Sequence, residues 1–170
     1  MQRKSYGNMH CPIARSLDRV GEWWSILILR DAFYGLRRFD EFQKNLGVAP
    51  NMLTRRLNAL VAAGLLERRR YQEHPPRDEY LLTERGRDFR PVLLALLAWG
   101  NRHFAPEGAA VQLRNLRTGA EVDPVVVDGA TGEEIAGPDF MLVAGPGADD
   151  GVRQRLAERG RRPFAPRSEA

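Results

Sequence analysis

The stretch that decides the fold is residues 38–83, RFDEFQKNLGVAPNMLTRRLNALVAAGLLERRRYQEHPPRDEYLLT. Its first part, 38–46, has apolar side chains at helical spacing, namely Phe39, Phe42 and Leu46. Gly47 is suited to end this helix, and Pro50 is suited to the first turn of a second helix over about 50–63. Two short helices joined by a tight glycine-containing turn predict a helix-turn-helix.

The predicted second helix has two contrasting faces. Its apolar stripe falls at i, i+4, i+7 and i+8, as Leu53, Leu57, Leu60 and Val61. The opposite stripe consists of hydrogen-bonding residues, Asn51, Thr54, Arg55 and Asn58. Arginine pairs with guanine, asparagine pairs with adenine, and threonine contacts the thymine methyl, so this stripe is suited to reading bases in a major groove. Arg56 lies beside the stripe and is better placed to contact a phosphate. The alternative is an ordinary surface helix, since any such helix shows a polar stripe, but the short helix before it and the basic hairpin after it favour a recognition helix.

A β-hairpin is expected next. Residues 65–71 and 78–82 are compatible with strands, and Pro75-Pro76 between them cannot be helical, so we predict a wing whose tip spans 72–77. The hairpin carries basic side chains suited to phosphates or to a minor groove. Since side chains alternate along a strand, Arg69 is expected to face away from Arg68 and Arg70. The predicted DNA contacts of the wing are therefore Arg68, Arg70, His74 and Arg77. A solvated surface, in a chain with 24 arginines and 2 lysines, is the alternative.

Helices are expected on both sides of this stretch. Residues 12–20 have helical apolar spacing, and residues 22–34 are apolar nearly all round, as in a central buried helix. Thr83 is suited to cap a long helix over about 84–105, with a kink at Pro91, which lacks a backbone donor. The apolar surface of that helix is suited to a dimer contact, although a monomer core could use the same residues, Leu93, Leu96, Leu97, Trp99 and Phe104.

The C-terminal third differs in character. It has short β-like runs, at 111–116, 122–127 and 140–145, then a short helix expected at 152–160 and a tail, 161–170, expected to be disordered. The fold is thus predicted to be mainly α with a β-hairpin wing (α+β), plus a small C-terminal β appendage. The expected domains are 1–106 for DNA binding and dimerisation, 107–148 for the appendage, and 149–170 for the helix and tail.

The composition indicates the cellular setting. Residues 1–106 carry 18 basic and 11 acidic side chains, and residues 107–170 carry 8 and 11, so the basic surplus lies where DNA would be met. No apolar stretch approaches the roughly 20 residues that a bilayer needs, and the N-terminus has no apolar signal core. The single cysteine fits a reducing compartment. We expect a cytoplasmic protein without membrane contact.

Several signatures over about residues 11–100 together resemble the HxlR family: Cys11-Pro12, Trp24 before ILILR, RRFDEF, LTRRL, GLLERRRY, HPPRDEYLLT and Trp99-Gly100. The resemblance implies a dimeric winged helix-turn-helix regulator, often a repressor. It implies that the 51–58 face enters the major groove, that 72–77 is the wing, and that the first and last helices build the dimer. Two departures are small: Ala49-Pro50 replaces a more usual capping serine, and Trp23 stands where a polar residue is frequent.

Cys11 is the predicted effector site. It precedes Pro12 at the start of a helix, where unpaired amides and the helix dipole favour an anion and hence a reactive thiolate. The resemblance points the same way, since some members of the family sense oxidants or electrophiles through the matching cysteine. The alternatives are an inert, half-buried thiol and control by a non-covalent small-molecule ligand.

No metal or cofactor is expected. Residues 117–135 resemble a zinc-ribbon-like module of longer family members, but the positions of its cysteines hold Thr118, Asp128 and Thr131. Threonine hydroxyls are poor zinc ligands, so we predict a metal-free appendage.

Catalysis is not expected either. The histidines, His10, His74 and His103, lie apart in sequence, and there is no GxSxG or phosphate-binding loop. His10 is a poor base for Cys11, because adjacent side chains on an extended segment point apart. We predict a DNA-binding transcriptional regulator, a repressor whose homodimer sets two recognition helices roughly 34 Å apart on a palindromic operator of double-stranded DNA. A protein-interaction adaptor on the same fold is the alternative.

Overall fold

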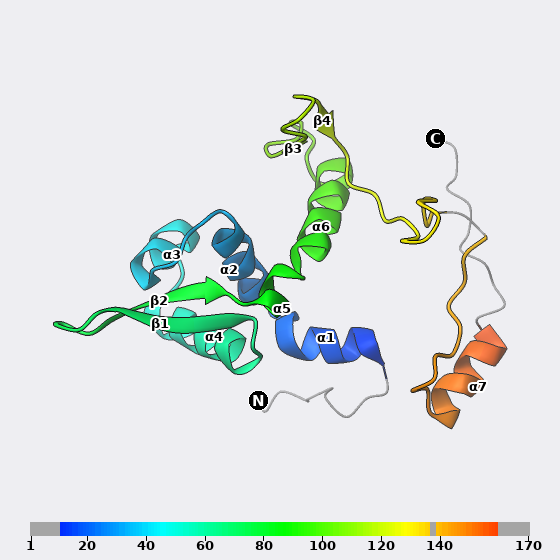
Figure 1. Cartoon of the computed structure of the whole chain (residues 1–170), viewed down its shortest axis with the longest axis horizontal. Coiled ribbons are helices and arrows are strands. Elements are labelled where there is room, and N and C mark those ends of the chain that lie inside the picture. Colours follow the sequence, from blue (N-terminus) through cyan, green and yellow to red (C-terminus); the bar gives the residue numbers. More distant parts are fainter. Residues whose placement is uncertain (1–10, 137–138, 160–170) are drawn as a thin grey trace. The chain divides into compact units, whose positions relative to one another are not determined.

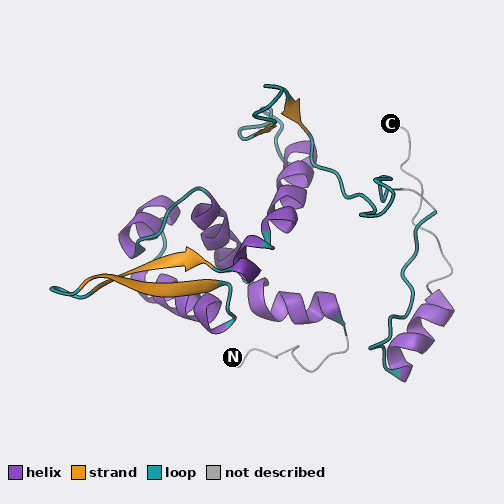
Figure 2. Ribbon diagram, in the orientation of Figure 1, coloured by secondary structure: helices purple, strands orange, loops and turns teal. Residues whose placement is uncertain are grey.

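The computed structural model describes residues 11–136 and 139–159 (Figure 1). The chain divides into two compact units, with the boundary between Leu93 and Leu94. In order, the first unit contains α1 (Pro12–Val20), α2 (Trp23–Phe33), α3 (Phe39–Leu46), α4 (Pro50–Ala62), β1 (Leu66–Gln72), β2 (Arg77–Leu82), α5 (Glu84–Arg87) and the start of α6 (Arg90–His103). Figure 2 shows the two strands as a long hairpin that runs beside α4.

The core of the first unit lies between α2, α3, α4 and the hairpin, which all contact one another through it. Its largest fully buried apolar side chains are Ile28, Leu29, Phe42, Leu53, Leu57, Leu60 and Leu66. Burying each of these contributes about 1.5–3 kcal/mol, so together they fix the helices against the hairpin. The predicted winged helix-turn-helix is therefore confirmed.

The turn between α3 and α4 follows from local chemistry. Gly47 ends α3 with φ +62, a left-handed conformation that glycine adopts without strain, and Pro50 occupies the first turn of α4. At the other end of α3, the Glu41 carboxylate accepts the backbone N–H groups of Arg37 and Arg38, at 2.8 and 2.9 Å. These two hydrogen bonds hold the pKa of Glu41 below its usual value.

The hairpin is joined to the start of α3 by a single β-bridge. β1 and β2 are antiparallel, with Leu66 opposite Leu82 and Arg70 opposite Asp78, and the register shifts between Arg70 and Gln72. On the outer side of β2, Arg38 forms a bridge with Glu79. The Tyr80 N–H also donates to the Arg37 carbonyl at 2.7 Å. The wing is thus tied by its backbone to the start of α3.

Two expectations for the first unit need correction. The long helix expected over 84–105 is two helices, α5 and α6, because Pro91 has no N–H for the preceding turn and its ring would clash with the carbonyl there. Thr83 caps α5 as predicted, since its Oγ1 accepts the Gly86 N–H at 3.0 Å. The central helix, α2, is not buried all round, because Trp23 at its N-terminal end is 72% exposed.

The second unit contains the rest of α6, β3 (Leu113–Arg114), β4 (Glu121–Val122) and α7 (Asp150–Arg159). β3 and β4 pair antiparallel, and Val127 bridges Glu134. The expected strand at 140–145 is wrong: its apolar side chains, Met141, Leu142 and Val143, are exposed, and the segment has no ladder to join. The tail expected to be disordered, 161–170, lies outside the described residues.

Candidate nucleic-acid interface

α4 presents its polar stripe to solvent. Leu53, Leu57 and Leu60 are 0% exposed on the inner face. The opposite face is exposed at all four predicted positions, Asn51, Thr54, Arg55 and Asn58. The second helix of this helix-turn-helix therefore has a fixed apolar face and an open face rich in hydrogen-bonding groups, which is the arrangement that base readout requires.

Arg55 is an exposed cation of this face. Its Nη2 lies 3.2 Å from the Met52 sulfur, one turn earlier, which is a weak interaction. Within residues 11–136 and 139–159, no carboxylate lies at ion-pair distance from it. Its fork of N–H donors is thus available to the O6 and N7 acceptors of guanine.

Arg56, for which we predicted a phosphate contact, has a different environment. Its Nη2 lies 2.8 Å from Glu22 Oε2, and its side chain is only 13% exposed. Glu22 immediately precedes α2, so the ion pair joins α4 to the start of that helix. Arg56 therefore supports the position of α4, and its contact with a phosphate stays a prediction.

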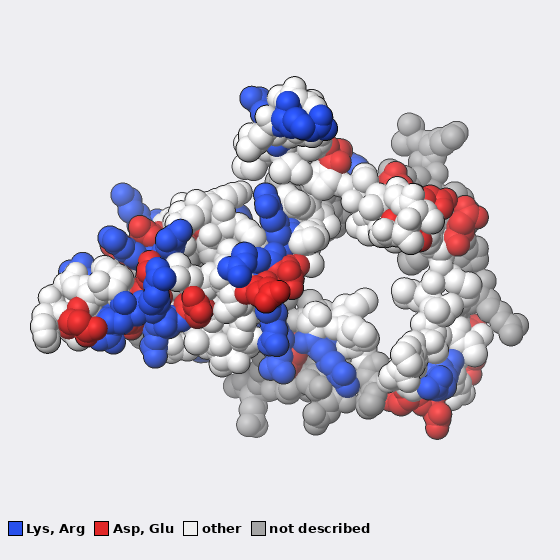
Figure 3. Space-filling view, viewed as in Figure 1, with Lys and Arg blue, Asp and Glu red and all other residues white. Residues whose placement is uncertain are grey.

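The arginines of the wing are paired across the hairpin. Arg69 Nη2 lies 2.6 Å from Glu79, Arg70 Nε lies 2.5 Å from Asp78, and Arg68 lies 3.9 Å from Asp78. The expected alternation is confirmed, because Arg69 pairs with one carboxylate and its neighbours share the other. Figure 3 shows the result as basic and acidic side chains interleaved over the hairpin. His74 and Arg77 are exposed at and beside the tip.

A buried carboxylate joins the first two helices of the site. Asp31 of α2 is 0% exposed, and its Oδ2 accepts the Asn45 side-chain N–H of α3 at 2.8 Å. Its Oδ1 accepts Nε and Nη2 of Arg30 at 2.9 and 2.8 Å. Sequence reasoning missed this group, although an acidic residue in a central, largely apolar helix was the signal. Asp31 helps to set the angle at which α3, and hence α4, is presented.

Cys11 lies immediately before α1 and is half-buried. Its carbonyl accepts the Arg15 N–H at 3.0 Å, which closes the first turn of the helix. The neighbour considered as its base, His10, lies outside the described residues. The structure therefore places the thiol at a helix start, as the sequence predicted.

The residues predicted to form a dimer contact differ in exposure. Leu96, Trp99 and Phe104 are 41%, 55% and 65% exposed. The Trp99 and Phe104 rings meet edge to face, 4.8 Å apart. Leu93 and Leu97 are half-buried, and Leu93 packs against the core of the first unit. α6 thus leaves an exposed aromatic pair near its C-terminus.

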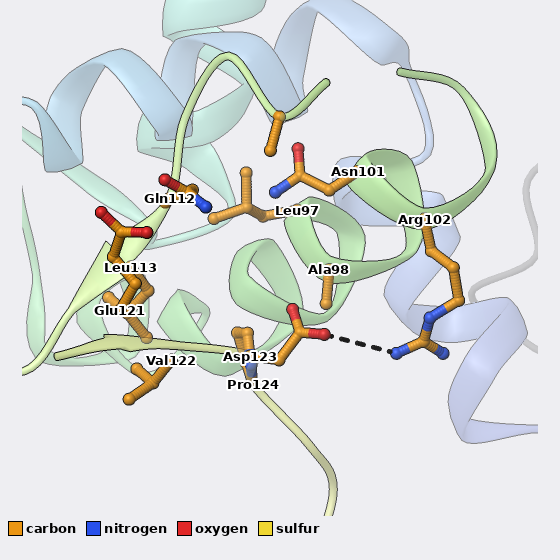
Figure 4. A pocket seen from close by; sticks show the side chains of 11 residues that line it. Leu97, Ala98, Asn101, Arg102, Gln112, Leu113, Glu121, Val122, Asp123 and Pro124 are labelled. Atoms are coloured by element: carbon orange, nitrogen blue, oxygen red, sulfur yellow. Dashed lines mark ion pairs between the residues drawn. The ribbon is translucent and has the colours of Figure 1, made fainter. Parts of the chain in front are cut away.

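The second unit contains a pocket of about 350 Å³ between α6 and the β3–β4 pair. Figure 4 shows Leu97 and Asn101 of α6 on one side. Asp123 faces Arg102 at its edge, with 3.7 Å between Oδ2 and Nη2. The walls of the pocket are partly apolar and include Leu97, Ala98, Leu113, Val122 and Pro124. Such a pocket can hold the apolar body of a small molecule and hydrogen-bond a polar group on it.

The side chains that stand where a zinc ribbon has its cysteines form hydrogen bonds within backbone turns. Asp128 Oδ1 accepts the Ala130 N–H at 2.7 Å, Thr131 Oγ1 accepts the Glu133 N–H at 3.2 Å, and Thr118 Oγ1 accepts the Ala120 N–H at 3.3 Å. Among the described residues there is no group of three or more His, Cys, Asp or Glu side chains able to hold a metal ion. The same residues include no helix with the length and apolar character needed to cross a membrane.

The fold and the open face of α4 define a winged helix-turn-helix DNA-binding protein. Residues 19–108 match the HxlR-like helix-turn-helix family, and the chain belongs to that family of transcriptional regulators. A Mycobacterium tuberculosis protein described as an uncharacterized HTH-type transcriptional regulator is 41% identical over 136 residues, 79% of this chain and 86% of its own.

Solved structures agree. A candidate transcription factor from Pseudomonas aeruginosa is 56% identical with a TM-score of 0.62, covering 86% of this chain and 100% of its own. A second candidate transcription factor, PA1607, is 40% identical with a TM-score of 0.74, covering 84% of this chain and 100% of its own. Both similarities extend well beyond the helix-turn-helix into the C-terminal third.

Proposed function

We propose that the protein is a sequence-specific repressor that binds a palindromic operator as a homodimer in the cytoplasm. The observation that carries the proposal is the open face of α4, whose four hydrogen-bonding residues lie opposite three leucines with 0% exposure. Arg55 reads a guanine, Asn51 and Asn58 read adenines, and Thr54 contacts a thymine methyl. An adaptor without DNA binding would have no need of this face.

A homodimer supplies the second recognition helix. α1 exposes Ile13 and Leu17, at 67% and 50%, and α6 exposes the Trp99–Phe104 pair. Contiguous patches of exposed apolar side chains mark surfaces that another protein covers. In a symmetric helix-turn-helix dimer the two recognition helices lie about 34 Å apart, one helical turn of DNA, and we propose this spacing for the two α4 helices.

Arg55→Ala tests the base-reading face. Loss of a bidentate contact to guanine should weaken binding to a duplex selected by the wild type by about 1–3 kcal/mol. The matched control is Arg117→Ala, which removes an exposed arginine of the second unit and should change binding little. Affinities are measured by fluorescence anisotropy at one salt concentration. Equal binding by wild type and Arg55→Ala would refute the assignment of this face.

For the effector, we propose that Cys11 responds to oxidants or electrophiles. The chain is similar to the redox regulator HypR in its oxidized form, at 35% identity with a TM-score of 0.51 over 55% of this chain and 97% of that one. The position of Cys11 at the start of α1 also supports the proposal, since modification there would disturb a helix that exposes part of the proposed dimer surface. The second candidate, supported by the α6 pocket, is a non-covalent small-molecule ligand.

Cys11→Ser separates these two modes of control. We expect the variant to bind DNA like the wild type but to lose the response to a quinone or to hydrogen peroxide. We expect the wild-type thiol to react with an electrophile at neutral pH faster than an ordinary free thiol, as a redox-sensing cysteine does. A wild-type rate no faster than that of glutathione would count against redox sensing and leave the pocket as the candidate effector site.

A further inference from the structure

The β1–β2 hairpin carries no net charge. Residues 66–82 contain four arginines and four carboxylates, with histidine neutral. Three of the arginines, Arg68, Arg69 and Arg70, lie within ion-pair distance of Asp78 or Glu79. An arginine that is already paired gains less from a phosphate, because the existing pair must be weakened first. The run of arginines is thus a poorer phosphate site than its sequence indicates.

Two nearby arginines differ from these three. Neither Arg38 nor Arg77 has a carboxylate at ion-pair distance among the residues that the structure describes. Arg38 instead lies over the ring of Tyr71, with its guanidinium carbon 4.7 Å from the ring centroid. Stacking on an aromatic ring restrains the guanidinium and leaves its N–H edge free for an oxygen acceptor.

Both arginines line the same hollow. It has a volume of about 440 Å³ and lies between the start of α3 and the wing, with Tyr71 and Pro76 among its walls. The bridge between Arg38 and Glu79 fixes one side of the hollow to the other through the backbone. Asp40 and Asp78 also line it, but Asp78 is already neutralised by Arg70 at 2.5 Å. Among the described residues that line the hollow, two arginines without a carboxylate at ion-pair distance therefore outweigh Asp40. Glu41 does not line the hollow, and its carboxylate accepts the backbone N–H groups of Arg37 and Arg38.

We propose that this hollow binds a phosphate of the DNA backbone through Arg38 and Arg77. The inference rests on the proposed function and assigns a contact that the recognition helix does not supply. In a helix-turn-helix the first helix crosses the DNA backbone, and Arg38 immediately precedes that helix, α3. Guanidinium groups bind phosphate oxygens through two parallel hydrogen bonds, so a restrained Arg38 also fixes the register of the protein on the duplex.

The test is the salt dependence of DNA binding by the full chain, measured on a selected duplex and on a scrambled one. Loss of one phosphate contact should lower the slope of log K against log salt by about 0.9 for each bound subunit. We expect this change in Arg38→Ala, with binding weakened about tenfold and equally on both duplexes. Arg77→Ala should act in the same direction, and Arg38→Lys, which keeps the charge, should keep most of the slope.

The matched control is Arg69→Ala, which removes the same charge from the wing but from a paired arginine. It should leave the slope within experimental error of the wild type, and thermal unfolding confirms that each variant is folded. A slope change in Arg69→Ala as large as in Arg38→Ala would overturn the inference, as would an unchanged slope in Arg38→Ala. A wild type that binds no DNA would instead refute the proposed function itself.

Discussion

Asp31→Ala is expected to lower the free energy of unfolding by about 3 kcal/mol. The carboxylate is 0% exposed and accepts three hydrogen bonds, two from Arg30 and one from Asn45. Its removal therefore leaves a cavity and three N–H groups that lose their acceptor. Removing one partner of a buried charged pair costs about 3–5 kcal/mol, and the value here lies at the lower end because Arg30 is 37% exposed and regains water.

Urea unfolding monitored by circular dichroism measures this effect. The control is Asp88→Ala, which removes an exposed carboxylate and should change stability by less than about 0.5 kcal/mol. Since Asn45 belongs to α3, Asp31→Ala should also weaken DNA binding at a temperature where the variant is folded. If Asp31→Ala were no more destabilising than Asp88→Ala, the buried carboxylate would have no part in holding α3.

Gly86→Ala is expected to have a similarly large effect for a steric reason. A Cβ built on Gly86 would lie 2.1 Å from the Leu65 carbonyl oxygen and 3.1 Å from Leu82 Cδ2. The backbone oxygen belongs to the segment that begins β1, so the methyl group cannot be accommodated without moving α5 away from the hairpin. Overpacking of this kind costs about 1–3 kcal/mol, and a contact this short places the cost at or above the upper end.

Gly100→Ala is the matched control for that substitution. Gly100 lies inside α6, and among the described residues no atom beyond the adjacent backbone of its own helix lies within 4 Å of a Cβ placed there. Alanine there should stabilise the helix by about 0.5–1 kcal/mol, since glycine loses more backbone freedom on folding. Melting temperatures of the two variants should therefore move in opposite directions. A Gly86→Ala protein as stable as the wild type would show that α5 does not pack as described.

The helices of the first unit were predictable because each has a local signal. Periodic apolar residues, Gly47 and Pro50 placed α3 and α4 within one residue of their observed ends. The sequence predicted a kink where the chain has a break between α5 and α6, because a proline can either kink a helix or stand in the first turn of a new one. The expected strand at 140–145 was wrong because β-propensity describes fit to a partner strand, and none is present there.

The open face of α4 followed from side-chain spacing, but the electrostatics of the site did not. Arg56 adjoins the polar stripe in sequence, and its pairing with Glu22 depends on how α4 packs near the start of α2. In the same way, the neutralisation of Arg69 and Arg70 depends on the register that sets Glu79 and Asp78 opposite them. Contacts between residues distant in sequence decide which arginines are free, and the sequence alone does not contain them.

The central claim, that the exposed face of α4 reads DNA bases, is tested most directly by selecting bound duplexes from a random library. The selection is made with the wild type and with Arg55→Ala. The account predicts a palindromic site for the wild type, with half-sites centred about 10 base pairs apart. Arg55→Ala should relax the preference for guanine at one position of each half-site and leave the other positions unchanged. Identical preferred sequences for the two proteins, or no preferred sequence for the wild type, would contradict it.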